Sequence, residues 1–108
     1  MNAFNFEEFD EFVKWENSRC VTRDNPATKN EAILVGVTKF MEENGELASE
    51  ILINLKLVRK EKFYDNFDKL AEEFADCMIV LCMLADRCGI DMSKAIQDKM
   101  NVVKNRKY

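Results

Sequence analysis

Glycine and proline are scarce in this chain, and no other feature of the sequence constrains its fold as strongly. The 108 residues include three glycines and one proline. Because these residues mark turns and interrupt helices, so small a number favours a few long helices over many short strands. At 47% hydrophobic content, a chain of this length can build one compact core but not two. We therefore expect an all-α protein with a single domain over residues 1–108.

The spacing of the apolar residues predicts four helices. They cover about 6–20, 30–59, 66–88 and 91–103. We expect Asn30 and Asp91 to be N-caps, and Gly89 to end the third helix. The first helix and the loop with the only proline then occupy residues 1–30, and the motif-bearing helices occupy 31–108.

The second helix carries an apolar stripe with acidic residues beside it. The stripe recurs at three- and four-residue steps and consists of Ile33, Val37, Phe40, Leu47, Ile51, Leu55 and Val58. At about 100° per residue, Glu43, Glu46 and Glu50 fall in a narrow arc next to it. The acidic arc is therefore expected to border the core.

The third helix is apolar on nearly all sides in its second half, CMIVLCMLA at 77–85. Such a segment must be enclosed by other helices, from the same chain or from a second subunit. It is far too short to span a bilayer, and the start MNAFNFEEFDEF lacks the features of a secretory signal. We expect a soluble, cytoplasmic protein that does not bind membranes.

Charge and cysteine content exclude further classes. The net charge of −4 gives no electrostatic reason to bind a nucleic-acid polymer, whereas a free nucleotide chelated by a divalent cation is compatible with it. The four cysteines form no C-x-x-C motif and the chain has no histidine. Buried, reduced cysteines are therefore favoured over a zinc site.

Two pairs of carboxylates stand out. Glu43 and Glu46 are three residues apart on one helix, and so are Glu73 and Asp76 on the next. Like charges at this spacing repel, which indicates a positive partner between the pairs. Oxygen-only ligands match hard cations, magnesium in particular, and the absence of histidine excludes a ferritin-like di-iron site. Solvated helix faces remain the alternative reading of both pairs.

These acidic motifs carry a resemblance. EENGELASEI at 42–51, followed by EEFADCMIVLCMLADRCGIDMSKAIQDKM at 72–100, resembles the MazG-like nucleoside triphosphate pyrophosphohydrolases, from about residue 33 to the C-terminus. The resemblance implies a four-helix bundle completed by dimerisation, sometimes as a tetramer. It also implies hydrolysis of a nucleoside triphosphate to the monophosphate and pyrophosphate. The expected cofactor is Mg²⁺, for which Mn²⁺ can substitute, held by Glu43, Glu46, Glu73 and Asp76.

Other residues are weaker candidates for the same site. Glu50 shares the acidic arc and is a candidate for holding a second metal or orienting water. Lys99, Lys104 and Arg106 are expected to contact phosphates, or else only to complement a helix C-terminus. Trp15 could stack on a base, with burial in the core as the alternative. The alternative function is a non-catalytic dimerisation or regulatory module that keeps the fold and binds nucleotide or protein.

Overall fold

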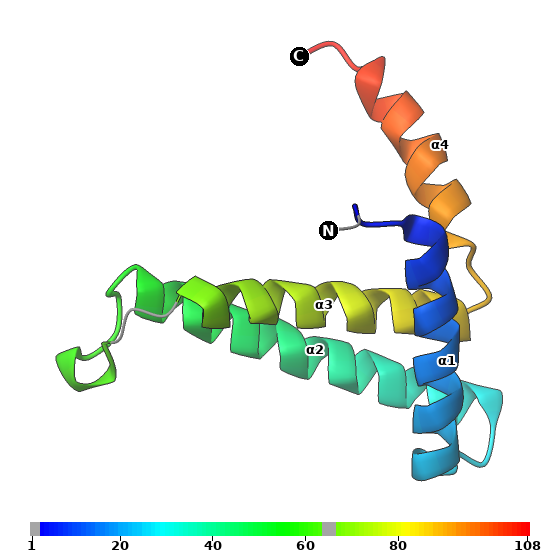
Figure 1. Ribbon diagram of the computed structural model, residues 1–108, viewed down its shortest axis with the longest axis horizontal. Coiled ribbons are helices and arrows are strands. Elements are labelled where there is room, and N and C mark those ends of the chain that lie inside the picture. The colour runs from blue at the N-terminus through cyan, green and yellow to red at the C-terminus, as the bar shows by residue number, and fades with distance from the viewer. Residues whose placement is uncertain (1–2, 64–66) are drawn as a thin grey trace.

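The computed structural model describes residues 3–63 and 67–108, and four α-helices dominate them (Figure 1). The helices are α1 (Phe6–Asp24), α2 (Lys29–Asn54), α3 (Phe67–Arg87) and α4 (Met92–Lys104), with a short 3₁₀ helix η1 (Lys60–Lys62). No strand occurs in the described residues. The expected all-α class and the expected number of long helices are therefore confirmed for this part of the chain.

The helices α2 and α3 form an antiparallel hairpin that the other two helices meet only near one end (Figure 1). The helix α1 crosses the hairpin close to the C-terminal end of α3, and α4 leads away from both. Within one chain the four helices thus do not close into a bundle. The long hairpin is the element that positions the acidic motifs.

The core lies mainly between α1 and α3. It is formed by Val13, Cys20, Cys82 and Met83, with Phe9, Ile79 and Met92 packed against it. All four cysteines are free. Burial is confirmed for Cys20 and Cys82, but Cys88 is exposed because it lies just past the end of α3, where no helix covers it.

The end of α3 and the start of α4 are as predicted. Asp91 caps α4, since its side chain accepts a hydrogen bond from the Lys94 N–H at 3.1 Å. Gly89 has φ of 75°, and the Ile90 N–H donates to the Ala85 carbonyl at 2.9 Å, which closes α3 in a Schellman motif. The expected start of this helix near Asn66 lies outside the described residues, and α3 is described from Phe67.

The N-cap of α2 was wrongly predicted at Asn30. Thr28 caps the helix instead, because its hydroxyl oxygen accepts a hydrogen bond from the Glu31 N–H at 3.1 Å. Threonine followed three residues later by glutamate is a capping-box signature that was readable from the sequence. The helix α1 also continues past Cys20 to Asp24, where Asn25 ends it with φ of 48°.

The C-terminal end of α2 comes earlier than the predicted residue 59. The helix ends at Asn54, and Lys56 adopts the left-handed conformation with φ of 58°. The Leu57 N–H then donates to the Leu52 carbonyl at 2.9 Å. This is the same Schellman closure as in α3, but a lysine takes the position that glycine usually occupies. No local sequence signal announces it.

The face of α2 that contacts α3 coincides only in part with the predicted stripe. Five residues of the stripe are partly buried as expected: Ile33, Phe40, Leu47, Ile51 and Val58. Val37 is 41% exposed and Leu55 is 62% exposed, whereas Glu43 and Glu50 are buried. Gly36 is also buried, and a Cβ there would lie 3.1 Å from the Leu84 side chain, so the helices approach closely at this point. The contact is rotated toward the acidic arc, and two of its glutamates enter the interface instead of bordering it.

The apolar second half of α3 is not enclosed on every side by its own chain. Met78 and Leu81 remain exposed on it, and so does Phe74 just before it. Cys82, by contrast, is 4% exposed and packs in the core with α1. Among the described residues, no helix combines the length and hydropathy that crossing a bilayer requires.

Candidate metal centre

The two acidic motifs meet between α2 and α3. Carboxylate oxygens of Glu43, Glu73 and Asp76 all lie within 4.8 Å of one another. Glu43 is 7% exposed and Glu73 is 5% exposed, while Asp76 lies on the exposed rim. The hairpin thus brings together side chains from both motifs, with a deep pair and a rim residue that opens to solvent.

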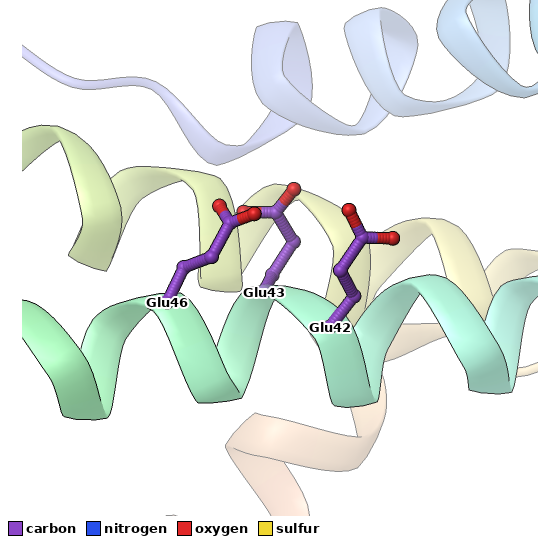
Figure 2. A group of neighbouring side chains, drawn as sticks. All are labelled: Glu42, Glu43 and Glu46. Carbon is purple, nitrogen blue, oxygen red and sulfur yellow. The ribbon is translucent and has the colours of Figure 1, made fainter.

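A second acidic group shares Glu43 with the first. Carboxylate oxygens of Glu42, Glu43 and Glu46 lie within 4.8 Å of one another, and their side chains point to the same side of α2 (Figure 2). Glu42 was not among the residues that the sequence assigned to the site. Its i, i+4 spacing from Glu46 was a signal that could have found it.

Two lysines, also missed at the sequence level, contact the buried pair. Lys39 Nζ lies 3.1 Å from Glu43 Oε1, and Lys69 Nζ lies 3.2 Å from Glu73 Oε1. Each hydrogen bond raises the pKa of its lysine. The i, i+4 spacing of each lysine and its glutamate was readable from the sequence. Each lysine, however, contacts only one of the two oxygens of its glutamate.

The two lysines do not neutralise the second carboxylate oxygen of either glutamate. Glu43 Oε2 and Glu73 Oε2 are buried, and neither accepts a hydrogen bond from the described residues. Burial, followed by the charges of Glu43 and Glu73, raises the pKa of Asp76. The charge of Glu43, with burial adding to it, raises the pKa of Glu46. Unpaired buried carboxylate oxygens are costly. An oxygen-only ligand set of this kind therefore fits a hard divalent cation such as Mg²⁺.

A pocket of about 380 Å³ lies beside the acidic cluster, between α1, α2 and α3. Glu43 and Asp76 line it at the end where the carboxylates lie. The helix α1 supplies Phe12, Glu16, Arg19, Cys20, Arg23 and Asp24, and the other two helices supply Val35, Lys39, Ile79, Val80, Met83 and Arg87. Its four acidic and four basic side chains balance, so a bound divalent cation would give the pocket a net positive charge.

The cations predicted on the last helix do not line this pocket. Lys99 and Lys104 line a separate hollow on α4, and Arg106 lies beyond the end of that helix. The basic residues that do line the pocket are Lys39, Arg19, Arg23 and Arg87. Glu50 is buried on α2 but belongs to neither acidic group.

Trp15 lies on the surface next to the pocket. It is 55% exposed, so the alternative of a core tryptophan is wrong. Its ring centroid lies 5.9 Å from that of Phe12, and the guanidinium carbon of Arg19 lies 4.5 Å from the ring centroid. Trp15 thus contacts Phe12 and Arg19, which line the pocket, but Trp15 itself does not line it.

Fold and site define an all-α protein whose antiparallel hairpin holds a carboxylate cluster at the edge of a pocket. A family model described as MazG-like family matches residues 37–108, which include α3, α4 and most of α2. The chain belongs to the MazG-like family. The helix α1, which forms one wall of the pocket, lies outside the matched residues. No curated protein and no solved structure matches the chain.

Proposed function

We propose that this chain hydrolyses a nucleoside triphosphate to the nucleoside monophosphate and pyrophosphate, in a magnesium-dependent reaction. The observation that carries the proposal is the convergence of Glu43, Glu73 and Asp76 from two helices at the edge of a pocket large enough for a small molecule. Membership of the MazG-like family supports this class of reaction.

Glu43, Glu46, Glu73 and Asp76 are the residues that would hold Mg²⁺, or Mn²⁺ in its place. One buried oxygen each of Glu43 and Glu73, which accepts no hydrogen bond from residues 3–63 and 67–108, supports this assignment, because a cation would satisfy both. When bound, the metal neutralises charge on phosphoryl oxygens and lowers the pKa of a water ligand. Glu50, on the same helix as Glu43, stays a candidate for orienting the attacking water.

The reaction needs cations around the phosphates as well as the carboxylates. Water attacks the α-phosphorus and releases a proton to solvent, the bond to the bridging oxygen breaks, and pyrophosphate leaves with a gain of negative charge. Arg19 and Lys39 line the pocket and are placed to donate to those oxygens. Lys99, Lys104 and Arg106 stay predictions for the same role, and they would have to act in the site of a second chain, because α4 leads away from its own pocket (Figure 1).

We further propose a homodimer, with a tetramer as a larger assembly of the same contacts. Exposed apolar side chains on α2 and α3 support it, among them Leu34, Met41, Phe74 and Met78. Light scattering of active protein should give a multiple of the 12.6 kDa chain mass, and Met78→Glu should lower it. A single-chain mass for active protein at micromolar concentration would contradict the dimer.

Four free cysteines support a reducing, cytoplasmic location.

The decisive assay is pyrophosphate release from a panel of canonical and modified nucleoside triphosphates, in magnesium and in EDTA. We expect release with at least one substrate in magnesium and none in EDTA. Nucleotide binding without release for any member of the panel would instead indicate the non-catalytic module. The same assay with Glu73→Gln tests the buried carboxylate, since the neutral side chain keeps the shape but loses the charge.

A further inference from the structure

The pocket has a fixed cation at the end away from Glu43 and Asp76. Arg87, the last residue of α3, lines this end. Its Nε donates to Asn17 Oδ1 at 2.9 Å, and its Nη1 donates to the carbonyl of Ala32 at 2.8 Å. One guanidinium therefore contacts α1 and α2 while it belongs to α3.

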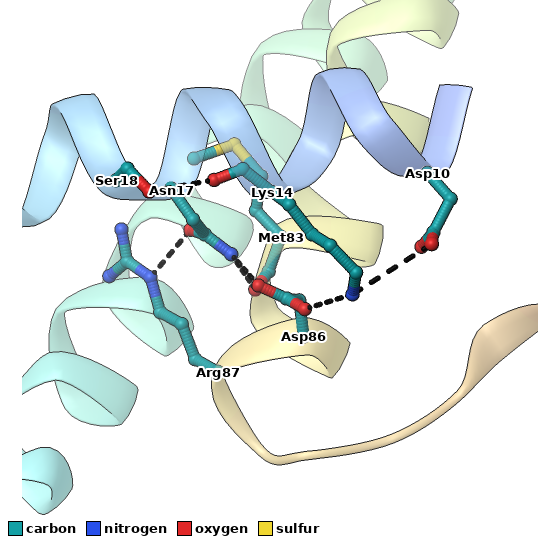
Figure 3. A network of polar contacts seen from close by, with 7 residues as sticks. All are labelled: Asp10, Lys14, Asn17, Ser18, Met83, Asp86 and Arg87. Carbon is teal, nitrogen blue, oxygen red and sulfur yellow. Dashed lines mark hydrogen bonds and ion pairs between the residues drawn. The ribbon is translucent and has the colours of Figure 1, made fainter. Parts of the chain in front are cut away.

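The partner of Arg87 is itself held in place. Asn17 is 5% exposed, and its Nδ2 donates to the Met83 carbonyl and to Asp86 Oδ2, both at 2.9 Å. Lys14 Nζ donates to the other oxygen of Asp86 at 2.9 Å (Figure 3). Because both amide hydrogens of Asn17 are used, its oxygen must face Arg87. The network fixes the position of the guanidinium before any ligand binds.

Arg87 differs from the other arginines of the pocket because it forms no ion pair with the described residues. Arg19 contacts Glu16 at 2.6 Å and Arg23 contacts Asp24 at 2.9 Å. Within residues 3–63 and 67–108, no carboxylate oxygen lies within 4.0 Å of Arg87, and its Nη2 makes no hydrogen bond. The guanidinium keeps donors for a ligand, because its hydrogen bonds go to neutral groups and the carboxylates of Asp24 and Asp86 act on its charge without pairing with it.

The wall that α3 contributes between the two ends of the pocket is apolar. Asp76 and Arg87 are separated by about 16 Å along α3 at 1.5 Å per residue. The side chains of Ile79, Val80 and Met83 line the pocket between them. Phosphates require the carboxylate end, where a metal would bind, and the flat faces of a base suit an apolar surface. The Arg87 end is then the part of the pocket that meets the edge of the base.

We propose that Arg87 is a specificity-determining residue that selects a base with two adjacent hydrogen-bond acceptors, guanine or cytosine, over adenine, uracil and thymine. This inference rests on the proposed function. A guanidinium pairs in bidentate fashion with O6 and N7 of guanine, and it can pair in the same way with N3 and O2 of cytosine. Adenine, uracil and thymine present no such pair. Glu16, which also lines the pocket, can accept from the amino group that guanine and cytosine both carry.

Calorimetry with nucleoside monophosphates tests the inference separately from hydrolysis. In magnesium, the wild-type protein should bind guanosine or cytidine monophosphate about tenfold or more tightly than adenosine or uridine monophosphate. Arg87→Lys keeps the charge but loses the planar fork, so this ratio should fall close to one. Arg59→Lys, an exposed arginine paired with Glu61 on the connector, is the matched control and should leave the ratio unchanged.

Each outcome decides one point. Equal binding of all four bases by the wild type would overturn the inference, as would an unchanged ratio in a folded Arg87→Lys. Weaker binding of every base by the same factor would assign Arg87 to phosphate and also overturn it. If Arg87→Lys does not fold, the wild type alone provides the test, since a guanine preference due to Arg87 should be lost with a 7-deazaguanosine nucleotide. Base-selective binding without pyrophosphate release would refute the proposed function and leave the role of Arg87 intact.

Discussion

Two buried polar clusters lie along α3, and they differ in how completely their hydrogen bonds are satisfied. Near the C-terminal end, Asn17 uses both amide hydrogens and its oxygen in contacts with Met83, Asp86 and Arg87 (Figure 3). Near the middle, Glu43 and Glu73 each keep a buried oxygen that is unpaired among the described residues. A satisfied cluster holds helices together, whereas an unsatisfied one marks a place where the fold accepts a cost for a ligand.

The largest expected effect is on activity, from a change in the unsatisfied cluster. Asp76→Asn should lower magnesium-dependent kcat/KM by about a thousandfold, because metal charge stabilisation is worth several kcal/mol. In EDTA the variant should be as stable as the wild type or more so, since one of several like charges is removed. Pyrophosphate release and urea unfolding measure the two effects.

Glu72→Gln is the control for this variant, because Glu72 is exposed on the same helix and belongs to neither acidic group. It should retain activity. Loss of helical circular dichroism together with activity in Asp76→Asn would assign Asp76 to structure, and the contrast between the two clusters would disappear.

The next largest effect is on stability, from a change in the satisfied cluster. Asn17→Leu should lower the free energy of unfolding by about 3 kcal/mol, because Asp86 and Arg87 lose a buried partner. Urea denaturation measures it. Ser18→Ala, at the adjacent exposed position, removes only a hydrogen bond from the Ser18 hydroxyl to the Lys14 carbonyl and should change stability by no more than about 0.5 kcal/mol. Equal stability of the two variants would show that the Asn17 network does not hold α1 in place.

Magnesium should stabilise the protein through the unsatisfied cluster alone. At a concentration one hundred times the dissociation constant, binding adds about 2.7 kcal/mol to the free energy of unfolding. The melting temperature of the wild type should therefore rise with magnesium, and that of Asp76→Asn should rise less. Asn17→Leu should keep the full increase. An unchanged wild-type melting temperature over millimolar magnesium would count against a preformed site.

The pH dependence should have opposite signs in the two clusters. Burial alone would raise the pKa of Asp86, but hydrogen bonds from Lys14 and Asn17 lower it below its ordinary value. Its contribution to stability is therefore present above about pH 4, the unfolded pKa, and is lost as the pH falls further. Asp76 and Glu46 have raised pKa values, so they oppose folding once ionised.

In EDTA, the stability of the wild type should then rise as the pH falls from 7 toward the ordinary pKa values of Asp76 and Glu46, and decline below about pH 4. The midpoint of urea unfolding, measured across this pH range, tests both the rise and the decline in stability. Asp86→Asn should weaken the acid decline, and Asp76→Asn should weaken the rise above it. A rise that persists unchanged in Asp76→Asn would remove the acidic cluster as its cause.

Local sequence signals predicted those helix ends that depend only on neighbouring residues in the chain. Gly89 and Asp91 determine the end of α3 and the start of α4 through backbone conformation and a single side-chain hydrogen bond. The left-handed Lys56 was not predicted, since lysine has no preference for that conformation and tertiary context must impose it. The N-cap at Thr28 could have been predicted from its capping box with Glu31, and the prediction of Asn30 overlooked that signal.

The sequence by itself determined the helical class and the two acidic motifs, because periodicity, caps and residue spacing act within one helix. Only the tertiary structure decided that α3 packs against the acidic arc of α2, which buries Glu43 and Glu73 with one oxygen of each left without a hydrogen-bond partner in the described part of the chain. It also decided that α1 forms a wall of the pocket and that Arg87 is held by Asn17 from that helix. The rotation of one helix against another depends on how side chains from distant parts of the chain fit together, and no periodicity within a single segment encodes that fit.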